Sequence, residues 1–159
     1  MSKAASLSHN TVFSILQDRQ GFIWIGTGNG LNRFDGSDTK VYKPVNDGVP
    51  GQIKGRVIKS RLLEDDDERI WFSTDVAVQC FEKKRDRFRS FNLKTGFANP
   101  LVIRGNSLFL SSIDGGVFEL NTVTGRSIQY PVTEKDAGGK PINLMYHGAA
   151  EKNNNIWFA

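Results

Sequence analysis

The chain has 159 residues, of which 38% are hydrophobic, 11% aromatic and 24% charged, and its formal net charge is +4. This composition is typical of a globular protein, and the absence of any apolar run near the ~18 residues of a spanning helix excludes a helical membrane span and predicts no membrane contact. The basic balance is compatible with acidic partners such as nucleic acid or sulfated and uronic sugars, without requiring them. The first residues lack the apolar region of a secretory signal, and the single cysteine, Cys80, is expected to be a buried small side chain.

The first predicted elements lie between residues 12 and 44. Short runs rich in β-branched and aromatic residues alternate there with Gly, Asn and Asp, which is typical of strands joined by tight turns. The predicted strands are residues 12–18, 22–27, 31–35 and 39–44. Asn29-Gly30 is a hairpin signal, because both residues tolerate the positive φ that a tight turn needs. We therefore expect a four-stranded antiparallel meander.

The rest of the chain repeats this unit. Trp24 and Trp71 are 47 residues apart, and Leu110 holds the tryptophan position of a third copy, 47 residues before Trp157. All three tryptophans thus occupy one position of the repeat. The predicted units are residues 12–44, 57–93 and 100–132, followed by the first half of a fourth unit at 143–159.

A four-stranded sheet repeated every 40 to 50 residues is typical of a β-propeller blade, whose faces are buried only when neighbouring blades stack. The tryptophan is the large packing residue that this stacking requires. A β-sandwich is the alternative all-β fold, but it does not need identical residues at a fixed period. Since rings have four to eight blades, three and a half blades predict a piece of a larger ring, with a dimer of two such chains as a less favoured alternative.

The segment SILQDRQGFIWIGTGNGLNRFDG, residues 14–36, closely resembles the repeat of the two-component regulator propellers, the sensor region of hybrid two-component regulators of gut Bacteroidetes. The second unit keeps Asp65 but lacks the glycines, and the later copies are more degenerate. The predicted structural repeat residues are Asp18, Gly21, Trp24, Thr27, Gly30, Leu31, Trp71, Thr74 and Trp157.

The resemblance implies a periplasmic propeller, usually one of two seven-bladed rings, that senses oligosaccharides and regulates a histidine kinase located elsewhere in the protein. It implies that this segment is not itself an enzyme. Two other readings stay open: a scaffold propeller that binds protein, which an apolar patch on the binding rim would favour, and a glycan-cleaving propeller, which would need paired carboxylates.

Residues that could carry other chemistry are few, and we expect no cofactor and no metal site. His9 and His147 are the only histidines, and no Cys-x-x-Cys or calcium loop occurs. Asp18 misses the spacing of a sialidase Asp box by one residue and is predicted to cap its turn. The acidic run 64–68 is predicted to be a solvated turn. The basic run 82–91 is predicted to be a turn and an outer strand with Phe88 inward and Arg89 outward, which argues against nucleic-acid binding by this segment.

Length differences between the repeats concentrate in the connections between units, which share one rim with the turns between second and third strands. Loops on a rigid scaffold usually carry recognition, so this rim is the predicted site for an oligosaccharide, which Lys and Arg would suit if it is acidic. The predicted ligand-binding residues are Ser8, His9, Asn10, Asn29, Asn46, Asp47, Lys54, Arg56 and Asp114.

Overall fold

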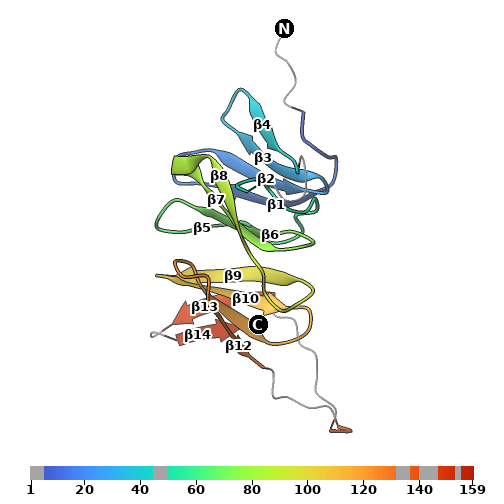
Figure 1. Cartoon of the computed structure of the whole chain (residues 1–159), viewed down its shortest axis with the longest axis vertical. Helices are drawn as coiled ribbons and strands as arrows, with labels where there is room; N and C mark the ends of the chain where they lie inside the picture. The colour runs from blue at the N-terminus through green and yellow to red at the C-terminus, as the bar shows by residue number, and fades with distance from the viewer. Residues whose placement is uncertain (1–5, 45–49, 132–136, 140–146, 153–154) are drawn as a thin grey trace. The chain divides into compact units, whose positions relative to one another are not determined.

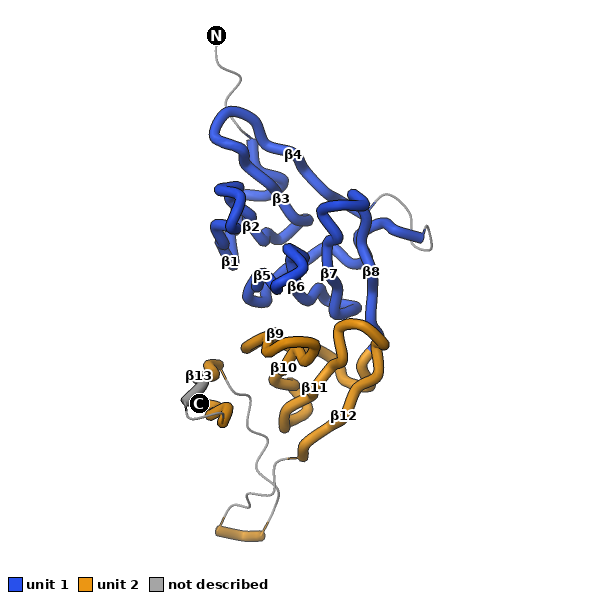
Figure 2. The backbone as a smooth tube through the Cα atoms, turned by 90° about the vertical axis from the view of Figure 1, so that its left-hand side faces the viewer, with its two compact units in different colours: residues 1–92 blue, residues 93–159 orange. Residues whose placement is uncertain are grey.

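The structure is a computed structural model that describes residues 6–44, 50–131, 137–139, 147–152 and 155–159. Regular structure in these ranges consists of antiparallel strands and one 3-10 turn, so the prediction of an all-β fold is confirmed. The chain divides into two compact units, residues 1–92 and 93–159 (Figure 2). No helix in the described ranges is long and apolar enough to cross a membrane.

Blade 1 is a four-stranded sheet in the order β1-β2-β3-β4 (Figure 1). Its strands are β1 (Val12–Gln17), β2 (Ile23–Thr27), β3 (Gly30–Phe34) and β4 (Thr39–Tyr42). Each strand pairs antiparallel with the next, as expected for a meander. The strand ends fall within one or two residues of the predicted ones because Gly, Asn and Asp interrupt the alternating pattern there.

Blade 2 has the same order, β5-β6-β7-β8, and belongs to the same unit. Its strands are β5 (Leu63–Glu64), β6 (Ile70–Ser73), β7 (Val78–Glu82) and β8 (Arg87–Phe91), and the 3-10 turn η1 (Lys83–Arg85) joins the last two. In β8 Phe88 is buried and Arg89 only partly so, which agrees with the predicted alternation of an outer strand.

The second unit contains one four-stranded and one two-stranded sheet. The first comprises β9 (Ala98–Arg104), β10 (Ser107–Ser112), β11 (Val117–Asn121) and β12 (Ser127–Tyr130). The second pairs β13 (Ala149–Lys152) with β14 (Asn155–Phe158). These sheets correspond to the third blade and the half blade of the repeat.

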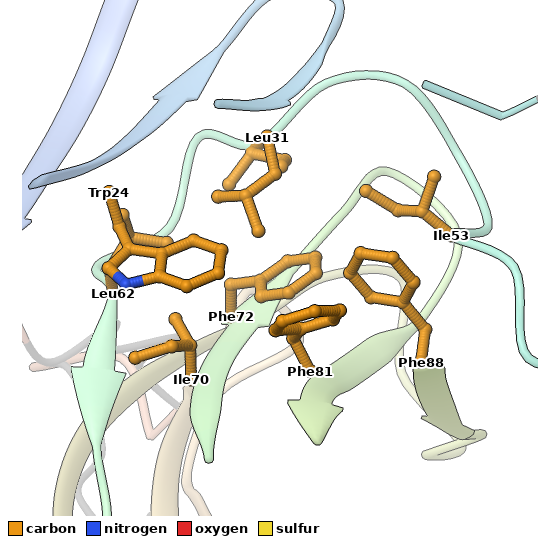
Figure 3. Close-up of a cluster of buried hydrophobic side chains, with 9 residues drawn as sticks. Trp24, Leu31, Ile53, Leu62, Ile70, Phe72, Phe81 and Phe88 are labelled. Carbon is orange, nitrogen blue, oxygen red and sulfur yellow. The ribbon is translucent and has the colours of Figure 1, made fainter. Parts of the chain in front are cut away.

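Blades 1 and 2 stack through an aromatic core (Figure 3). Trp24 is fully buried, and its ring centroid lies 5.3 Å from that of Phe81 in blade 2. Tyr42 lies 5.0 Å from Phe81 and 5.5 Å from Phe88 by the same measure. The buried cluster consists of Trp24, Leu31, Ile53, Ile58, Leu62, Ile70, Phe72, Phe81 and Phe88. The predicted role of the repeat tryptophan in blade stacking is therefore seen directly at Trp24.

The other tryptophan positions differ in burial. Trp71 and Leu110 are also fully buried, whereas Trp157 is 64% exposed. The packing expected of the repeat tryptophan is thus seen at Trp24 and not at Trp157, which lies in the two-stranded sheet of β13 and β14.

The turn between β2 and β3 lies where the Asn29-Gly30 signal predicted it, but β3 begins one residue earlier than expected, at Gly30. Thr27 pairs with Gly30, so the two loop residues are Gly28 and Asn29, and the positive φ of 109° belongs to Gly30. The Thr27 hydroxyl donates to the Gly30 carbonyl (2.9 Å) and accepts the Asn29 N–H (3.1 Å). Asn29 therefore does not need the left-handed conformation that we expected of it.

Candidate functional site

The strand order of unit 1 separates two rims. One rim, which we call the connection rim, is formed by residues 6–11, 28–29 and 50–57. The opposite rim, which we call the turn rim, is formed by residues 18–22, 35–38, 65–69 and 83–86. Most predicted ligand residues lie on the connection rim. Asn46 and Asp47 fall outside the described residues.

Ser8 is held by a buried amide of blade 1. The Ser8 N–H donates to Asn32 Oδ1 (2.8 Å), and Asn32 Nδ2 donates to Ser8 Oγ (2.8 Å). Ser8 Oγ also lies 2.8 Å from Thr27 Oγ1. Asn32 and Thr27 are fully buried, so this pair of hydrogen bonds fixes the segment that enters blade 1. The N–H and hydroxyl of Ser8 are therefore used for hydrogen bonds to blade 1.

Blade 2 uses the same device 47 residues later. The fully buried Gln79 accepts the Lys54 N–H at Oε1 (2.8 Å) and donates from Nε2 to the Lys54 carbonyl (2.6 Å). We call the two sites, at Asn32 and Gln79, amide clamps. The sequence did not lead us to predict a role for either residue. The signal for them was an amide side chain at the same repeat position in the third strand of both blades.

Arg56 is held by its backbone in a similar way. The Arg56 N–H donates to Asp75 Oδ1 (2.9 Å), and the Arg56 carbonyl accepts the Gly30 N–H (2.7 Å). The Lys54 and Arg56 residues themselves are exposed. The connection rim therefore presents two cations whose backbones are fixed by hydrogen bonds and whose side chains point into solvent.

The other predicted ligand residues are more varied. His9 Nδ1 accepts the Thr11 N–H (3.0 Å), and the His9 ring lies so close to Gly28 that a side chain there would collide with it. Asn10 is exposed and Asn29 half-buried. The structure thus brings His9 beside the β2–β3 turn, as expected for residues of one rim.

Asp114 belongs to the second unit and supports a connection there. Its Oδ2 accepts the Gly96 N–H (2.9 Å) and the Thr95 hydroxyl (2.8 Å), and these two bonds lower the pKa of Asp114. Asp75 likewise accepts a backbone N–H, that of Arg56, in the connection before blade 2. Asp114 therefore stabilises the loop at Thr95 and Gly96 in its own unit.

A cavity of about 360 Å³ opens on unit 1 beside the N-terminal segment. Apolar side chains make most of its wall. The lining residues are Ser6, Leu7, Ser8, Val41, Tyr42, Lys43, Gln52, Ile53 and Phe88. It combines aromatic rings with a few polar groups, as small-molecule pockets commonly do.

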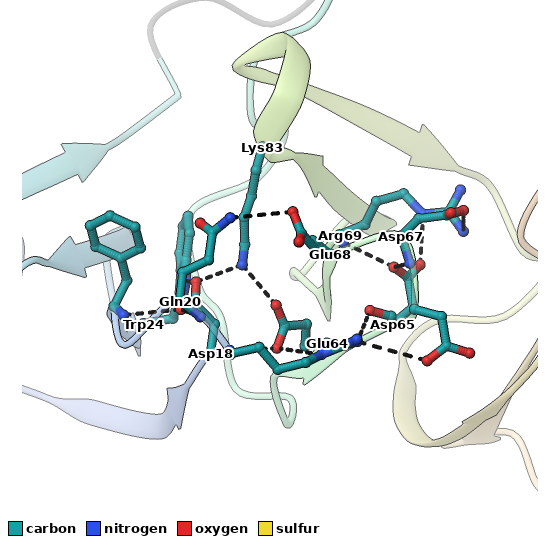
Figure 4. Close-up of polar contacts among 12 residues, drawn as sticks. Asp18, Gln20, Trp24, Glu64, Asp65, Asp67, Glu68, Arg69 and Lys83 are labelled. Atoms are coloured by element: carbon teal, nitrogen blue, oxygen red, sulfur yellow. Dashed lines mark hydrogen bonds and ion pairs between the residues drawn. The ribbon is translucent and has the colours of Figure 1, made fainter.

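The turn rim is occupied by a buried ionic network (Figure 4). Lys83 of blade 2 lies 2.6 Å from Asp18 Oδ2 of blade 1 and 2.8 Å from Glu64 Oε1. Asp18 also accepts the Trp24 indole N–H (2.7 Å) and, as predicted for a turn cap, the N–H groups of Gln20 and Phe22 (3.0 Å each). Burial alone raises the pKa of Asp18, but the bonds from Lys83 and Trp24 outweigh it and hold the pKa below its usual value.

The acidic run 64–68 is only partly the solvated turn that we predicted. The Glu64 side chain is 7% exposed and Asp65 is buried, because Glu64 binds Lys83 and Asp65 accepts the Trp71 indole N–H (2.6 Å). In the described residues no group of three or more His, Cys, Asp or Glu is placed to hold a metal ion. Cys80 is buried, and burial raises the pKa of its thiol to about 12, so it stays a neutral, unreactive thiol.

Comparison with known proteins agrees with this geometry. Residues 6–29 match the two component regulator propeller family, which confirms the resemblance seen in the sequence. A histidine kinase of Formosa agariphila is 49% identical over 37 residues, which are 23% of this chain and 3% of that protein. The chain therefore spans a small part of the relative that it matches.

Solved structures support the fold. The extracellular domain of a hybrid two component system from B. thetaiotaomicron aligns with a TM-score of 0.77 at 24% identity, over 96% of this chain and 22% of that one. A second such domain from the same organism gives 0.66 at 22% identity, over 94% and 22%. The computationally designed Ika4 protein gives 0.64 at 13% identity, over 99% and 98%. At these identities the likeness concerns the fold alone.

Proposed function

We propose that this chain is part of the extracellular or periplasmic sensor propeller of a two-component signalling protein, and that its connection rim binds an acidic oligosaccharide. The family match at residues 6–29 and the names of the similar proteins support the sensor role. A histidine kinase elsewhere in the whole protein would receive the signal as a shift in the populations of the sensor's conformations.

The observation that carries the ligand class is the pair Lys54 and Arg56. Gln79 and Asp75 form hydrogen bonds to the backbones of Lys54 and Arg56. These bonds fix the backbone of both residues, while their cationic side chains remain exposed to solvent. A carboxylate or sulfate meeting such cations forms charge-assisted hydrogen bonds, and Arg can bind it with two of its N–H groups. A fixed backbone lowers the entropy lost on binding.

Calorimetric titration with a uronic, a sulfated and a neutral oligosaccharide of equal length tests this proposal. We expect binding of an acidic sugar only, and a roughly ten-fold or greater weakening in Lys54→Ala or Arg56→Ala, because a hydrogen bond to a charged group contributes about 1.5–3 kcal/mol. Lys84→Ala is the matched control, since Lys84 is exposed on the turn rim. Equal weakening by Lys84→Ala would show non-specific charge attraction instead.

A second candidate, binding of a protein, is favoured by the largely apolar wall of the 360 Å³ cavity. A partner would insert an apolar side chain into this cavity, against the wall that Tyr42 and Phe88 help to form. In that case Leu7→Asp, on the cavity wall, would abolish capture of the partner and leave titration with acidic sugars unchanged. Weaker sugar binding in Leu7→Asp would instead make the cavity part of the oligosaccharide site.

A further inference from the structure

The first strand of blade 1 contains a β-bulge at its connection-rim end. Val12 pairs with Thr27, and Ser14 pairs with Gly26. Since Thr27 and Gly26 are consecutive, Phe13 is an extra residue without a cross-strand partner. A bulge turns a side chain away from the direction that strict alternation would give it, and bulges are frequent beside binding and active sites. Phe13 is 42% exposed, so the bulge places an aromatic ring in contact with water next to the connection rim.

The Phe13 ring meets the segment that leads into blade 2. Lys59 Nζ lies over this ring, 5.9 Å from its centroid. The preceding residue, Ile58, donates its N–H to the Thr27 carbonyl at the end of β2 (3.0 Å). The backbone that carries Lys59 is thus fixed to blade 1. Phe13 and Lys59 therefore belong to the junction between the two stacked blades of unit 1.

The contact between Phe13 and Lys59 contributes little to folding. Its 5.9 Å lies at the outer limit, about 6 Å, for a cation held over an aromatic ring. Both side chains are exposed, and a cation–aromatic contact is weak where water reaches both groups. An aromatic face and a cation are therefore accessible to a ligand at one place.

Lys59 also continues the row of cations that begins at Lys54 and Arg56. All three residues are exposed, and none of them forms a salt bridge with a described residue. On the turn rim, by contrast, Lys83 binds Asp18 at 2.6 Å. Three residues along the chain separate Arg56 from Lys59, so their Cα atoms are at most about 11 Å apart. A short acidic oligosaccharide can therefore contact both cations.

We infer that Phe13 and Lys59 form a second subsite for the acidic oligosaccharide, beside the pair Lys54 and Arg56. One sugar ring stacks with its C–H face on Phe13, because the face of an aromatic ring is electron-rich. The carboxylate or sulfate of that sugar accepts charge-assisted hydrogen bonds from the Lys59 ammonium group. This inference rests on the proposed function. It adds that the ligand spans more than one acidic unit and that an aromatic ring orients it.

Calorimetric titration with a uronic mono-, di- and trisaccharide tests the inference. In the wild type the dissociation constant should fall about ten-fold or more from the monosaccharide to the trisaccharide, because only the longer ligand reaches both subsites. Phe13→Leu and Lys59→Ala should each bind the trisaccharide at least about five-fold more weakly. Phe13→Tyr keeps the ring and should keep the affinity. Tyr130→Ala is the matched control, since Tyr130 is a similarly exposed aromatic residue (47%) of the second unit.

Nuclear magnetic resonance of the bound sugar distinguishes stacking from a general apolar contact. An aromatic ring shields protons that lie over its face, so the C–H protons of one sugar unit should shift upfield in the wild type and in Phe13→Tyr. The shift should be absent in Phe13→Leu, which keeps an apolar side chain without the ring. Circular dichroism checks that each variant is folded. A shift that persists in Phe13→Leu would overturn the inference.

The outcomes separate the second subsite from the proposed function. If Lys54→Ala and Arg56→Ala weaken binding but Phe13→Leu and Lys59→Ala do not, the second subsite is overturned and the proposed function stands. If only Phe13→Leu and Lys59→Ala weaken binding, the second subsite is supported and the role of Lys54 and Arg56 is overturned. Equal weakening by Tyr130→Ala would overturn the second subsite, and a wild type that binds no acidic oligosaccharide would overturn both proposals.

Discussion

At the scale of single residues, the two aspartates that bind the repeat tryptophans are stabilised by different cations. Asp18 bonds to Trp24 and Asp65 to Trp71, six residues later in both cases. Asp18 takes its cation, Lys83, from the next blade, whereas Asp65 lies 2.6 Å from Arg69 Nε of its own turn. The repeat spacing could predict the aspartates but not their cations, because Lys83 comes from the non-repeated part of the unit.

Replacing Lys83 should destabilise unit 1 strongly. Lys83→Met leaves Asp18 and Glu64 buried without their shared cation, and breaking a buried ion pair on one side costs about 3–5 kcal/mol of the free energy of unfolding. Urea denaturation followed by circular dichroism measures the change, and Lys84→Met on the exposed neighbour is the control. A loss below about 1 kcal/mol, as expected of surface substitutions, would show that water reaches the pair.

The same network makes stability depend on pH. The pKa of Asp18 is lower in the folded chain than its usual value, and so is the pKa of Glu82. Burial alone raises the pKa of Glu82, but the hydrogen bonds and charges of Arg87 and Arg85 together outweigh burial. Their stabilisation is complete above the unfolded-state pKa values of about 4 and is lost as the pH falls through the lower folded-state values.

Denaturation at a series of pH values between 7 and 2 checks this expectation. The free energy of unfolding should be level above about pH 5 and decline below about pH 4. Asp18→Asn should reduce the slope of that decline, whereas Asp66→Asn should not, because the Asp66 side chain is 94% exposed. An identical slope in Asp18→Asn would exclude Asp18 as a source of the acid sensitivity.

At the scale of elements, turn composition predicted where the strands end but not which residue of the β2–β3 turn has a positive φ. Asn29-Gly30 marked the hairpin correctly, yet the Thr27 hydroxyl bonds set the loop at Gly28 and Asn29. Gly30 then approaches the Tyr42 carbonyl of β4 too closely for a Cβ atom. This approach depends on β4, which lies beyond the next turn of the chain, so the residues of the β2–β3 turn alone could not predict it.

Gly30→Ala and Gly36→Ala separate the two reasons for glycine. Both residues have positive φ, 109° and 101°, but a Cβ at Gly36 would meet nothing within 4 Å. We expect Gly36→Ala to lower the free energy of unfolding by about 1 kcal/mol, from the backbone conformation alone. Gly30→Ala should lose at least 1–3 kcal/mol more through collision with the Tyr42 carbonyl. Equal losses in urea denaturation would show that β4 moves aside.

The amide clamps show why the candidate site was predicted only in part. Loop position and residue type indicated the right rim, but they could not show which groups the scaffold itself uses. Ser8 is taken up by Asn32, while Gln79 and the backbone of Lys54 satisfy each other. Buried polar groups must be paired, so the clamps depend on burial, which appears only once the blades stack.

At the scale of the whole molecule, the contacts that join blade 1 to blade 2 belong to one compact unit. The buried aromatic cluster and the network of Asp18, Glu64 and Lys83 all lie within residues 1–92, one of the two compact units. The repeat predicted this modularity, since blades are held mainly by their nearest neighbours. It could not predict that the boundary would fall after the second blade.

A fragment of residues 1–92 should therefore fold by itself. We expect a single cooperative unfolding transition, and a Lys83→Met loss equal within about 0.5 kcal/mol to that in the full chain, because distant regions contribute independently. Circular dichroism with urea measures both. The fragment also retains Lys54 and Arg56, so its affinity for acidic oligosaccharide should match that of the full chain. A fragment without a cooperative transition would show that blades 1 and 2 depend on residues 93–159.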